Sequence, residues 1–270
     1  MKNYNYDEKE LLLFEEYAKV FTLPSLCGPT GTNSKLAGKR LGIVNGSSWV
    51  SVWSNYFSHK ILPEVMRLNV GNDGMQYNFM LAHKNGEACP PEKNIQAMAD
   101  EAEQLCDLYR VDALICTCST MNRAYPVVAK RVEKYGIPVV QIDIPLMEQA
   151  LLTGNSILVI ATHGPTVDNT RILLQETAQR LQKKPVIYGV TEESAFEEIA
   201  SGNIKAHNEI IANAIRASKK KFDFDVVVLA QLSMSVFKLS FPDCEKEFGV
   251  PVLTSGECGF ERIKEILLSQ

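Results

Sequence analysis

A chain of 270 residues, 46% hydrophobic and 22% charged, has a globular composition, which excludes extended disorder, collagen-like repeats and a disulfide scaffold. The formal net charge of −4 argues against the basic stripe of a nucleic-acid-binding protein, so no nucleic-acid partner is expected. No segment approaches the roughly 18 consecutive apolar residues of a membrane span, and residues 1–17 do not resemble a secretory signal.

Residues 1–39 differ from the rest of the chain and are interpreted as an N-terminal arm. An amphipathic helix is predicted around residues 8–20. A turn-rich connector follows it, marked by Pro24, Gly28, Pro29, Gly31 and Gly38. Two interpretations stay open: a solvent-facing extension, or a segment that clasps a second subunit or covers a cleft. We expect the protein to form a homo-oligomer.

From Arg40 onward, short apolar runs alternate with longer amphipathic segments, which is typical of a parallel sheet with helical crossovers. This alternation excludes all-α and all-β folds and predicts an α/β fold. Strands are predicted at residues 41–45, 75–83, 113–116, 139–142, 157–161, 185–188, 226–230 and 250–253. Helices are predicted at residues 51–68, 92–109, 121–135, 146–152, 166–181, 192–200, 205–221, 235–248 and 256–268.

Two similar corner sequences indicate that the chain consists of two related halves. Gly136-Ile137-Pro138 and Gly249-Val250-Pro251 each offer a glycine that can end a helix and a proline that can begin a strand. Each corner also follows a strand-turn-helix unit, so an internal duplication is the economical explanation. We therefore predict two pseudo-symmetric parallel-sheet lobes, residues 40–143 and residues 144–255. The last helix, within residues 256–270, is expected to pack on the first lobe.

The most informative polar residues follow the predicted strand at 113–116. Ligands of open parallel sheets bind where the strands end, and the run here is Cys116-Thr117-Cys118-Ser119-Thr120. The start of the next helix and its backbone amides are expected to lower the pKa of the Cys118 thiol. Cys118 is therefore predicted to be the most reactive cysteine. A role as small buried hydrophobes is favoured for Cys27, Cys89, Cys106 and Cys244.

The cysteines do not predict a metal site or disulfides. Cys116 and Cys118 could be half of a metal site, but none of the four histidines has a ligand-like spacing to them; these are His59, His83, His163 and His207. Seven cysteines, an odd number in a chain too long to need a disulfide framework, are expected to be free thiols in a reducing cytoplasm.

Three other strand ends carry small polar residues ahead of a predicted helix. They are Asn45-Gly46-Ser47-Ser48-Trp49, Thr162-His163-Gly164-Pro165-Thr166 and Gln231-Leu232-Ser233-Met234-Ser235. Each is explained by ordinary helix N-capping or by binding of an anion through hydroxyls and backbone amides. Together with the Cys118 loop, they suit a small anionic substrate held between two lobes. The glycine-rich signatures of dinucleotide, phosphate and α/β-hydrolase sites are missing from the sequence.

The order of these motifs resembles the aspartate, glutamate and hydantoin racemase superfamily. Leu114-Ile115-Cys116-Thr117-Cys118-Ser119-Thr120 is similar to the first catalytic segment of these enzymes, with Ser119 where asparagine is usual. Residues 41–49 resemble their opening strand and Ser-Trp loop. Residues 137–140 with Pro145 resemble the crossover into the second lobe, and residues 157–162 resemble its first strand. The arm has no counterpart in this resemblance.

The resemblance implies a two-lobed, cofactor-independent enzyme with its active site between the lobes. Its substrate would be a small carboxylate, an amino acid or a hydantoin-like compound. Two cysteines would face each other across the substrate, one removing the α-proton and the other delivering a proton to the opposite face. The resemblance makes Cys118 an acid/base, and implies that Ser119, Thr120 and the loops containing Asn45, Gly46, Ser47, Ser48, Thr162, His163 and Thr166 bind the substrate.

The chain departs from the family pattern at the second cysteine. The motif expected after residues 226–229 reads Ala230-Gln231-Leu232-Ser233, so Gln231 occupies the position of the second thiol. Glutamine cannot transfer protons at neutral pH, and Ser233 has no adjacent activating group in the sequence. An isomerase of the racemase or epimerase type leads our hypotheses. A single-cysteine decarboxylase similar to arylmalonate decarboxylases and a non-catalytic small-acid binding protein stay open.

Overall fold

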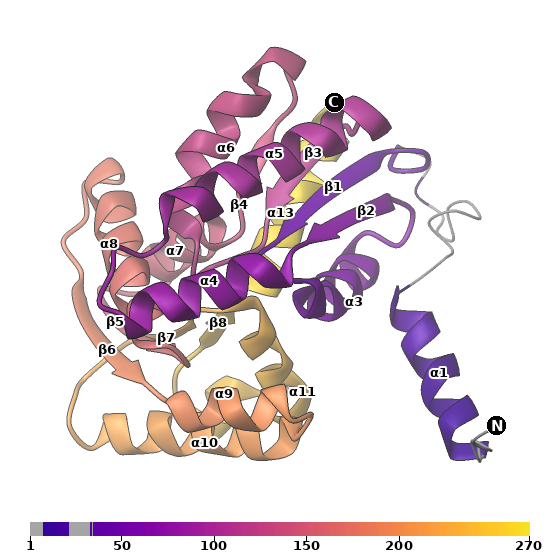
Figure 1. The fold of residues 1–270 in the computed structure, drawn as a ribbon. Coiled ribbons are helices and arrows are strands. Elements are labelled where there is room, and N and C mark those ends of the chain that lie inside the picture. The colour runs from indigo at the N-terminus through magenta and orange to yellow at the C-terminus, as the bar shows by residue number, and fades with distance from the viewer. Residues whose placement is uncertain (1–7, 22–32, 34) are drawn as a thin grey trace.

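Figure 1 shows the computed structural model of the protein, which describes residues 8–21, 33 and 35–270. The described residues form two four-stranded parallel sheets. The first sheet has the order β2-β1-β3-β4, with β1 at Arg40–Asn45, β2 at Met66–Gly71, β3 at Ala113–Cys116 and β4 at Val139–Gln141. The second has the order β6-β5-β7-β8, with β5 at Ser156–Ala161, β6 at Val186–Thr191, β7 at Val226–Leu229 and β8 at Val252–Thr254. The two orders are equivalent, which confirms the predicted pair of pseudo-symmetric α/β lobes.

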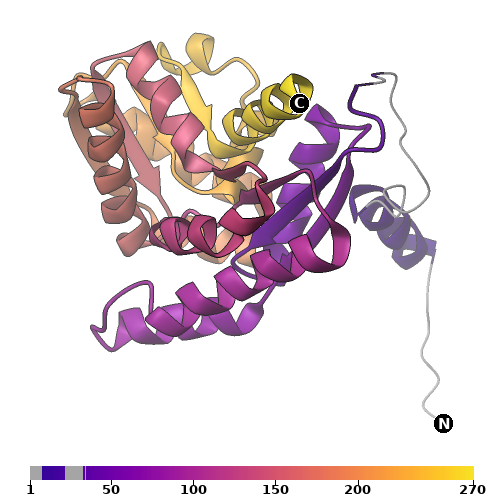
Figure 2. The same cartoon turned by 90° about the horizontal axis from the view of Figure 1, so that it is seen from above.

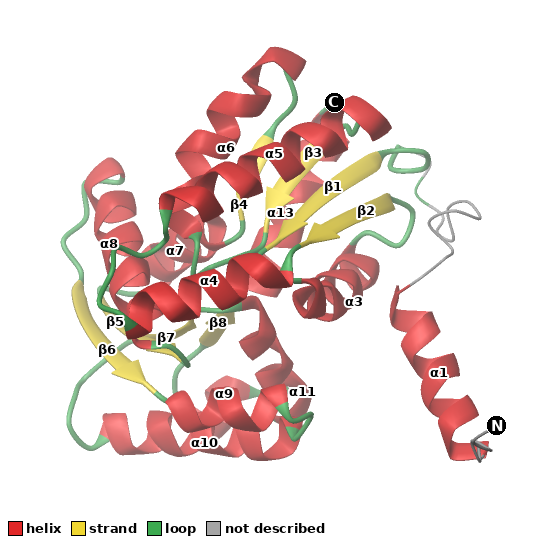
Figure 3. Ribbon diagram, viewed as in Figure 1, coloured by secondary structure: helices red, strands yellow, loops and turns green. Residues whose placement is uncertain are grey.

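Helices cover both faces of each sheet, as Figure 3 shows. The first sheet packs α4 (Asp73–Lys84), α5 (Glu92–Tyr109) and α6 (Tyr125–Val132) on one face, and α3 (Ser51–Ile61) and α13 (Ser255–Ser269) on the other. The second packs α9 (Glu193–Ala200), α10 (Ile204–Lys219), α11 (Phe237–Ser240) and α12 (Cys244–Phe248) on one face, and α7 (Asp143–Thr153) and α8 (Gly164–Arg180) on the other. Because the central strands are buried on both faces, they read in sequence as continuous apolar runs.

The helices α7 and α13 tie the two sheets together. Phe260 and Ile263 of α13, at the end of the chain, pack in the core of the first sheet, whereas Leu146 and Leu151 of α7 pack in the core of the second. The two helices also contact each other, and Figure 2 shows α13 in yellow beside the first sheet. Helix α7, which follows β4 of the first sheet, thus covers one face of the second sheet, and α13, which follows β8 of the second sheet, covers one face of the first.

The two glycine-proline corners are equivalent in structure. Gly136 and Gly249 end their helices in the left-handed conformation, with φ of 64° and 69°, which glycine adopts without a Cβ penalty. The carbonyl of Pro138 then accepts from the Leu114 amide at 2.9 Å, and the carbonyl of Pro251 accepts from the Val227 amide at 3.0 Å. Each corner thus begins the edge strand that pairs beside β3 or β7.

The strand predicted at residues 75–83 is wrong, because this segment is the helix α4. Met75, Phe79 and Ala82 are buried at helical spacing, and the Asn72 side chain caps the helix by accepting from the Gly74 amide at 3.0 Å. The helix predicted at 51–68 was also too long. It ends at Ile61, before Leu62 and Pro63, because a proline cannot continue a helix, and the edge strand β2 follows at Met66–Gly71.

The predicted arm helix is present as α1 at Glu8–Phe21, which packs beside α3. Leu11, Leu12, Leu13 and Tyr17 are exposed. The predicted connector residues Pro24, Gly28, Pro29 and Gly31 lie outside the described residues, as does Cys27. Within the described part of the chain, no helix is long and apolar enough to cross a membrane.

Candidate active site

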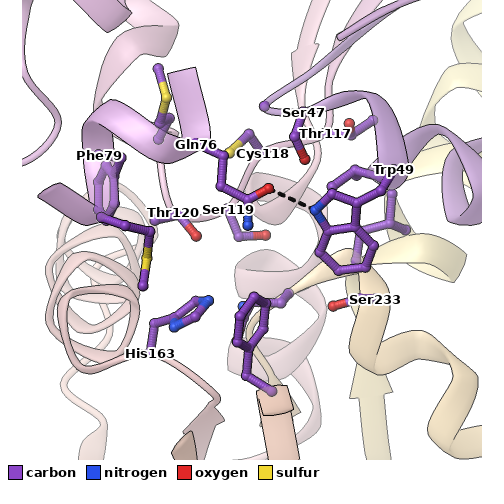
Figure 4. Close-up of a pocket in the computed structure, with 17 residues that line it drawn as sticks. Ser47, Trp49, Gln76, Phe79, Thr117, Cys118, Ser119, Thr120, His163 and Ser233 are labelled. Carbon is purple, nitrogen blue, oxygen red and sulfur yellow. Dashed lines mark hydrogen bonds between the residues drawn. The ribbon is translucent and has the colours of Figure 1, made fainter. Parts of the chain in front are cut away.

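A cavity lies where the carboxyl ends of the central strands of both sheets meet (Figure 4). The loops after β1 and β3 supply one side of it, and those after β5 and β7 supply the other. The cavity has a volume of about 70 Å³, several times the roughly 10–15 Å³ that one water molecule needs. Its walls are formed by Gly46, Ser47, Trp49, Val50, Gln76, Phe79, Met80, Thr117, Cys118, Ser119, Thr120, Met121, His163, Phe196, Gln231, Leu232 and Ser233.

Cys118 lies two residues beyond the end of β3 and lines this cavity, as predicted from its position in sequence. The backbone amides of Met121 and Thr120, at the following turn, favour the thiolate form of its sulfur. Gly46 packs directly behind the thiol, and a Cβ at that position would lie 2.4 Å from the Cys118 sulfur. The glycine after β1 therefore makes the space that the thiol occupies.

The predicted lowering of the Cys118 pKa is wrong. Burial of the sulfur raises the pKa of Cys118 to about 11, and the nearby Asp143 carboxylate also raises it. The amides of Met121 and Thr120 act in the opposite direction and do not compensate for the loss of solvation. The thiol of Cys118 is therefore protonated at neutral pH.

Gln231 lines the same cavity from the second sheet and is only 8% exposed. The amide and the hydroxyl of Thr162 both donate to Gln231 Oε1, at 2.6 and 2.8 Å. A backbone N–H can only donate, so the atom bonded to Thr162 is the oxygen of the Gln231 amide, and Nε2 is the end that Thr162 leaves free. Nε2 has no hydrogen bond to any residue that the structure describes. The position where the family resemblance implies a second thiol therefore offers a fixed hydrogen-bond donor.

His163 and Ser233 also approach the cavity from the second sheet (Figure 4). Burial lowers the pKa of His163, only partly opposed by Glu193, so its imidazole is neutral at pH 7. The His163 ring packs against Phe196, with 4.1 Å between the ring centroids. His163 is thus a second group in the cavity that can accept or donate a proton. Ser233 would need an activating base to do so.

On the first-sheet side, the hydroxyl of Ser119 is fixed by a buried carboxylate. Ser119 donates to Asp143 Oδ1 at 2.8 Å, and the Gln141 side-chain amide donates to Asp143 Oδ2 at 2.8 Å. Burial raises the pKa of Asp143 to about 6, although these two hydrogen bonds oppose the rise. Above pH 6 the Ser119 oxygen therefore has its lone pairs free to accept from another group.

Four residues that the sequence analysis placed among the substrate-binding groups do not line this cavity. Asn45 and Thr166 are fully buried, with Asn45 bonded to β2 and Thr166 Oγ1 3.2 Å from Thr120 Oγ1. Ser48 bonds to the Asp73 carboxylate, and Thr162 holds Gln231 from behind. Gly46, Ser47, Ser119, Thr120 and His163 do line the cavity, with Cys118, Gln231 and Ser233.

Most of the apolar lining of the cavity was missed in the sequence, where only Trp49 was named, as part of the loop after the first strand. This lining is formed by Trp49, Phe79, Met80 and Phe196, and the Trp49 ring nitrogen donates to Gln76 Oε1 at 2.6 Å. Phe79 and Met80 were hidden because their segment was predicted as a strand, and Phe196 because it lies on α9 and not at a strand end. Their helical spacing is the signal that could have identified the α4 residues.

Cys116 and Cys118, considered in the sequence as half of a metal site, have different surroundings in the structure. Cys116 is buried in the core, where desolvation raises its pKa to about 12, whereas Cys118 lines the cavity. Among the described residues, no three His, Cys, Asp or Glu side chains are grouped so that they could hold a metal ion.

Alkylation by iodoacetamide at pH 7.5 is expected to modify Cys89 before Cys118. Both thiols are partly exposed, and desolvation raises the pKa of both, but the rise is larger at Cys118, where burial and the Asp143 carboxylate bring the pKa to about 11 and leave little thiolate. Peptide mass spectrometry over a time course measures the order, and the Cys118 rate should rise about tenfold per pH unit across the alkaline range. Preferential labelling of Cys118, with a rate that levels off near pH 7, would show instead that its pKa is depressed.

Residues 81–263 match the family model of the Asp/Glu/hydantoin racemases. The fold is similar to that of an aspartate racemase from Picrophilus torridus, with a TM-score of 0.62 and 16% identity over 85% of this chain and 94% of that one. It is also similar to glutamate racemase RacE1 from Bacillus anthracis, with a TM-score of 0.63 and 16% identity over 86% and 82% of the two chains. An allantoin racemase from Klebsiella pneumoniae is similar with a TM-score of 0.59 and 13% identity, over 85% of this chain and 88% of that one. No curated protein matches the chain.

Proposed function

The chain belongs to the Asp/Glu/hydantoin racemase family, and from this premise we propose that it is a cofactor-independent enzyme that transfers a proton at the acidic carbon of a small carboxylate or carbonyl compound. Cys118 is the proposed acid/base. The observation that carries the proposal is a single cavity with the Cys118 thiol on one side and the fixed Gln231 amide on the other. Cys118 is the only thiol among the described residues of its walls.

In the proposed reaction, the small thiolate fraction of Cys118 takes the proton from the carbon next to the carboxylate, and the electron pair of the broken C–H bond stays on that carbon as a carbanion. The Cys118 thiol formed in this way, after exchange with water, returns a proton to the same face. The negative charge of such a carbanion spreads onto oxygen as an enolate, which preorganised donors stabilise. Gln231 Nε2 is one such donor, because Thr162 already holds its carbonyl oxygen. Gln231 itself cannot take or give a proton at neutral pH, so proton transfer is proposed at the Cys118 face alone.

Decarboxylation is a second candidate, favoured by the raised pKa of Cys118. Loss of carbon dioxide from a substituted malonate leaves the electron pair on the acidic carbon. A thiol that is protonated at neutral pH delivers its proton to this carbon, and the resulting thiolate is reprotonated by water.

Racemisation with two bases is favoured by a different observation, the neutral imidazole of His163 in the same cavity. Inversion needs a proton carrier on each face of the carbon, so His163 would have to act opposite Cys118. Loss of inversion without loss of exchange in His163→Ala would support this candidate.

A panel of amino acids, hydantoins and substituted malonates in deuterium oxide tests the proposal. We expect deuterium at the acidic carbon of at least one compound, or loss of carbon dioxide, both measured by NMR. Binding of a compound with neither reaction would instead identify a non-catalytic sensor of small acids. The Cys118→Ala variant is the control that separates reaction in the cavity from background exchange.

A further inference from the structure

The chemistry of the cavity walls restricts the substrate class. Among the residues that the structure describes, none of those lining the cavity is Asp, Glu, Lys or Arg. The nearest buried carboxylate, Asp143, stands behind Ser119, and both of its oxygens already accept hydrogen bonds. A neighbouring groove shares the Phe79, Met80, His163 and Phe196 walls with the cavity, and His83, Lys84, Glu193 and Glu197 line only that groove. No fixed countercharge therefore faces a ligand in the cavity.

Two hydrogen-bond donors of the cavity-lining residues have no partner within the described part of the chain. Ser47 is 1% exposed, and its hydroxyl has no hydrogen bond to any described residue. Gln231 lines the cavity from the second sheet, and its Nε2 likewise has no hydrogen bond within the described part of the chain. The N-terminus of the 17-residue helix α8 adds a positive partial charge at His163. These neutral donors suit one carboxylate or enolate, and the same field disfavours a cation.

Apolar side chains complete the cavity. The Trp49 and Phe196 rings meet edge to face, with 6.2 Å between their centroids, and Phe79 and Met80 also line the cavity. Aromatic rings in this arrangement pack well against another ring or a branched alkyl group. An ammonium group placed there would lose its hydration without gaining a carboxylate partner.

Resting on the proposed function, we infer that the substrate is a small acid whose acidic carbon carries an apolar ring or branched alkyl group and no ammonium group. The carboxylate lies toward Ser47 and Gln231, and the apolar group lies against Trp49 and Phe196. Aspartate and glutamate fit this cavity poorly, because their ammonium group and second carboxylate would both be buried without a partner.

Binding can be measured separately from reaction through the fluorescence of Trp49. The chain has two tryptophans, and in Trp53→Phe only the cavity tryptophan is left. The Trp53 ring nitrogen has no hydrogen bond within the described part, so this change breaks none there. The probes are 2-phenylpropionate and phenylglycine, which share a phenyl ring and a carboxylate but differ in the ammonium group. Aspartate and glutamate complete the set.

We expect 2-phenylpropionate to bind at least about tenfold more tightly than phenylglycine, and aspartate and glutamate to bind more weakly still. Phe196→Ala should weaken 2-phenylpropionate about tenfold, because a buried aromatic contact is lost. Leu108→Ala, which truncates an exposed side chain on α5, should leave the affinity unchanged. Equal binding of phenylglycine, or no effect of Phe196→Ala, would overturn the inference.

Different experimental results would reject the inferred substrate class and the proposed function. Tight binding of the aromatic acid without deuterium exchange or carbon dioxide loss from any such acid supports the substrate class and rejects the proposed reaction. Deuterium exchange into aspartate or glutamate, dependent on Cys118, supports the reaction and rejects the substrate class.

Discussion

Replacing Cys118 by alanine is expected to lower proton transfer at the substrate carbon by about 10²–10⁴-fold, the contribution usual for a general acid or base. Cys118 is the proposed proton carrier at its face, and the described residues of the cavity include no other thiol. NMR in deuterium oxide gives the rate of exchange or of carbon dioxide loss for the wild type and the variant. Cys118→Ser keeps the size of the side chain but not the acidity of the thiol, so it should be similarly impaired.

Cys258→Ala is the matched control for this change. Cys258 is a partly buried thiol that packs against the core of the second sheet, and burial raises its pKa to about 11, as it does for Cys118. It does not line the cavity, so its loss should leave the reaction rate unchanged. Activity in Cys118→Ala within about threefold of wild type would remove Cys118 from the reaction, since a threefold change corresponds to a barrier difference of only about 0.7 kcal/mol.

Adding one methyl group at Gly46 is expected to have the second-largest effect. A Cβ on Gly46 would lie 2.4 Å from the Cys118 sulfur and 3.0 Å from its Cβ, so Gly46→Ala must displace the thiol. A misplacement of about 1 Å can cost 10²-fold in rate, and we expect a loss of about that size. The atom displaced is the end of a side chain, so the thermal unfolding temperature should change much less than the rate.

Gly164→Ala controls for the general effect of replacing a glycine near the site. A Cβ on Gly164 meets no atom within 4 Å, and the residue begins the helix α8, where alanine is tolerated. It should retain its rate. A Gly46→Ala protein that is folded and fully active would show that the thiol does not work from the position seen in the structure.

The fold was predictable wherever one local signal dominated. Helix α5 was predicted with its observed bounds, because residues 92–109 combine a regular apolar face with a proline just before the first turn. The corners at Gly136 and Gly249 were predictable because a left-handed helix end strongly favours glycine. The segment 75–83 was predicted wrongly, because its apolar residues fit both the spacing of a strand and that of a helix. Pro63, which ends the preceding helix, and Asn72, which caps the next one, were the signals that favour a helix here.

The site was predictable where it depends on topology alone. Strand ends of two duplicated sheets meet at one place, so Cys118 and Gln231 were expected to share a cavity although they are far apart in sequence. The pKa of Cys118 was not predictable, because it depends on how completely the surrounding walls exclude water from the sulfur. Phe196 was missed for a similar reason, since only the packing of α9 brings it beside His163.

The stereochemical course of proton exchange tests the account most directly. One enantiomer of an acid that the enzyme turns over is incubated in deuterium oxide. NMR then measures deuterium at the acidic carbon, and chiral chromatography measures inversion. Because Cys118 is the proposed proton carrier and Gln231 cannot be one, deuterium should enter with retention of configuration, about 10²-fold faster than inversion. Inversion at the same rate as exchange would contradict the account and direct mutagenesis to His163 and Ser233.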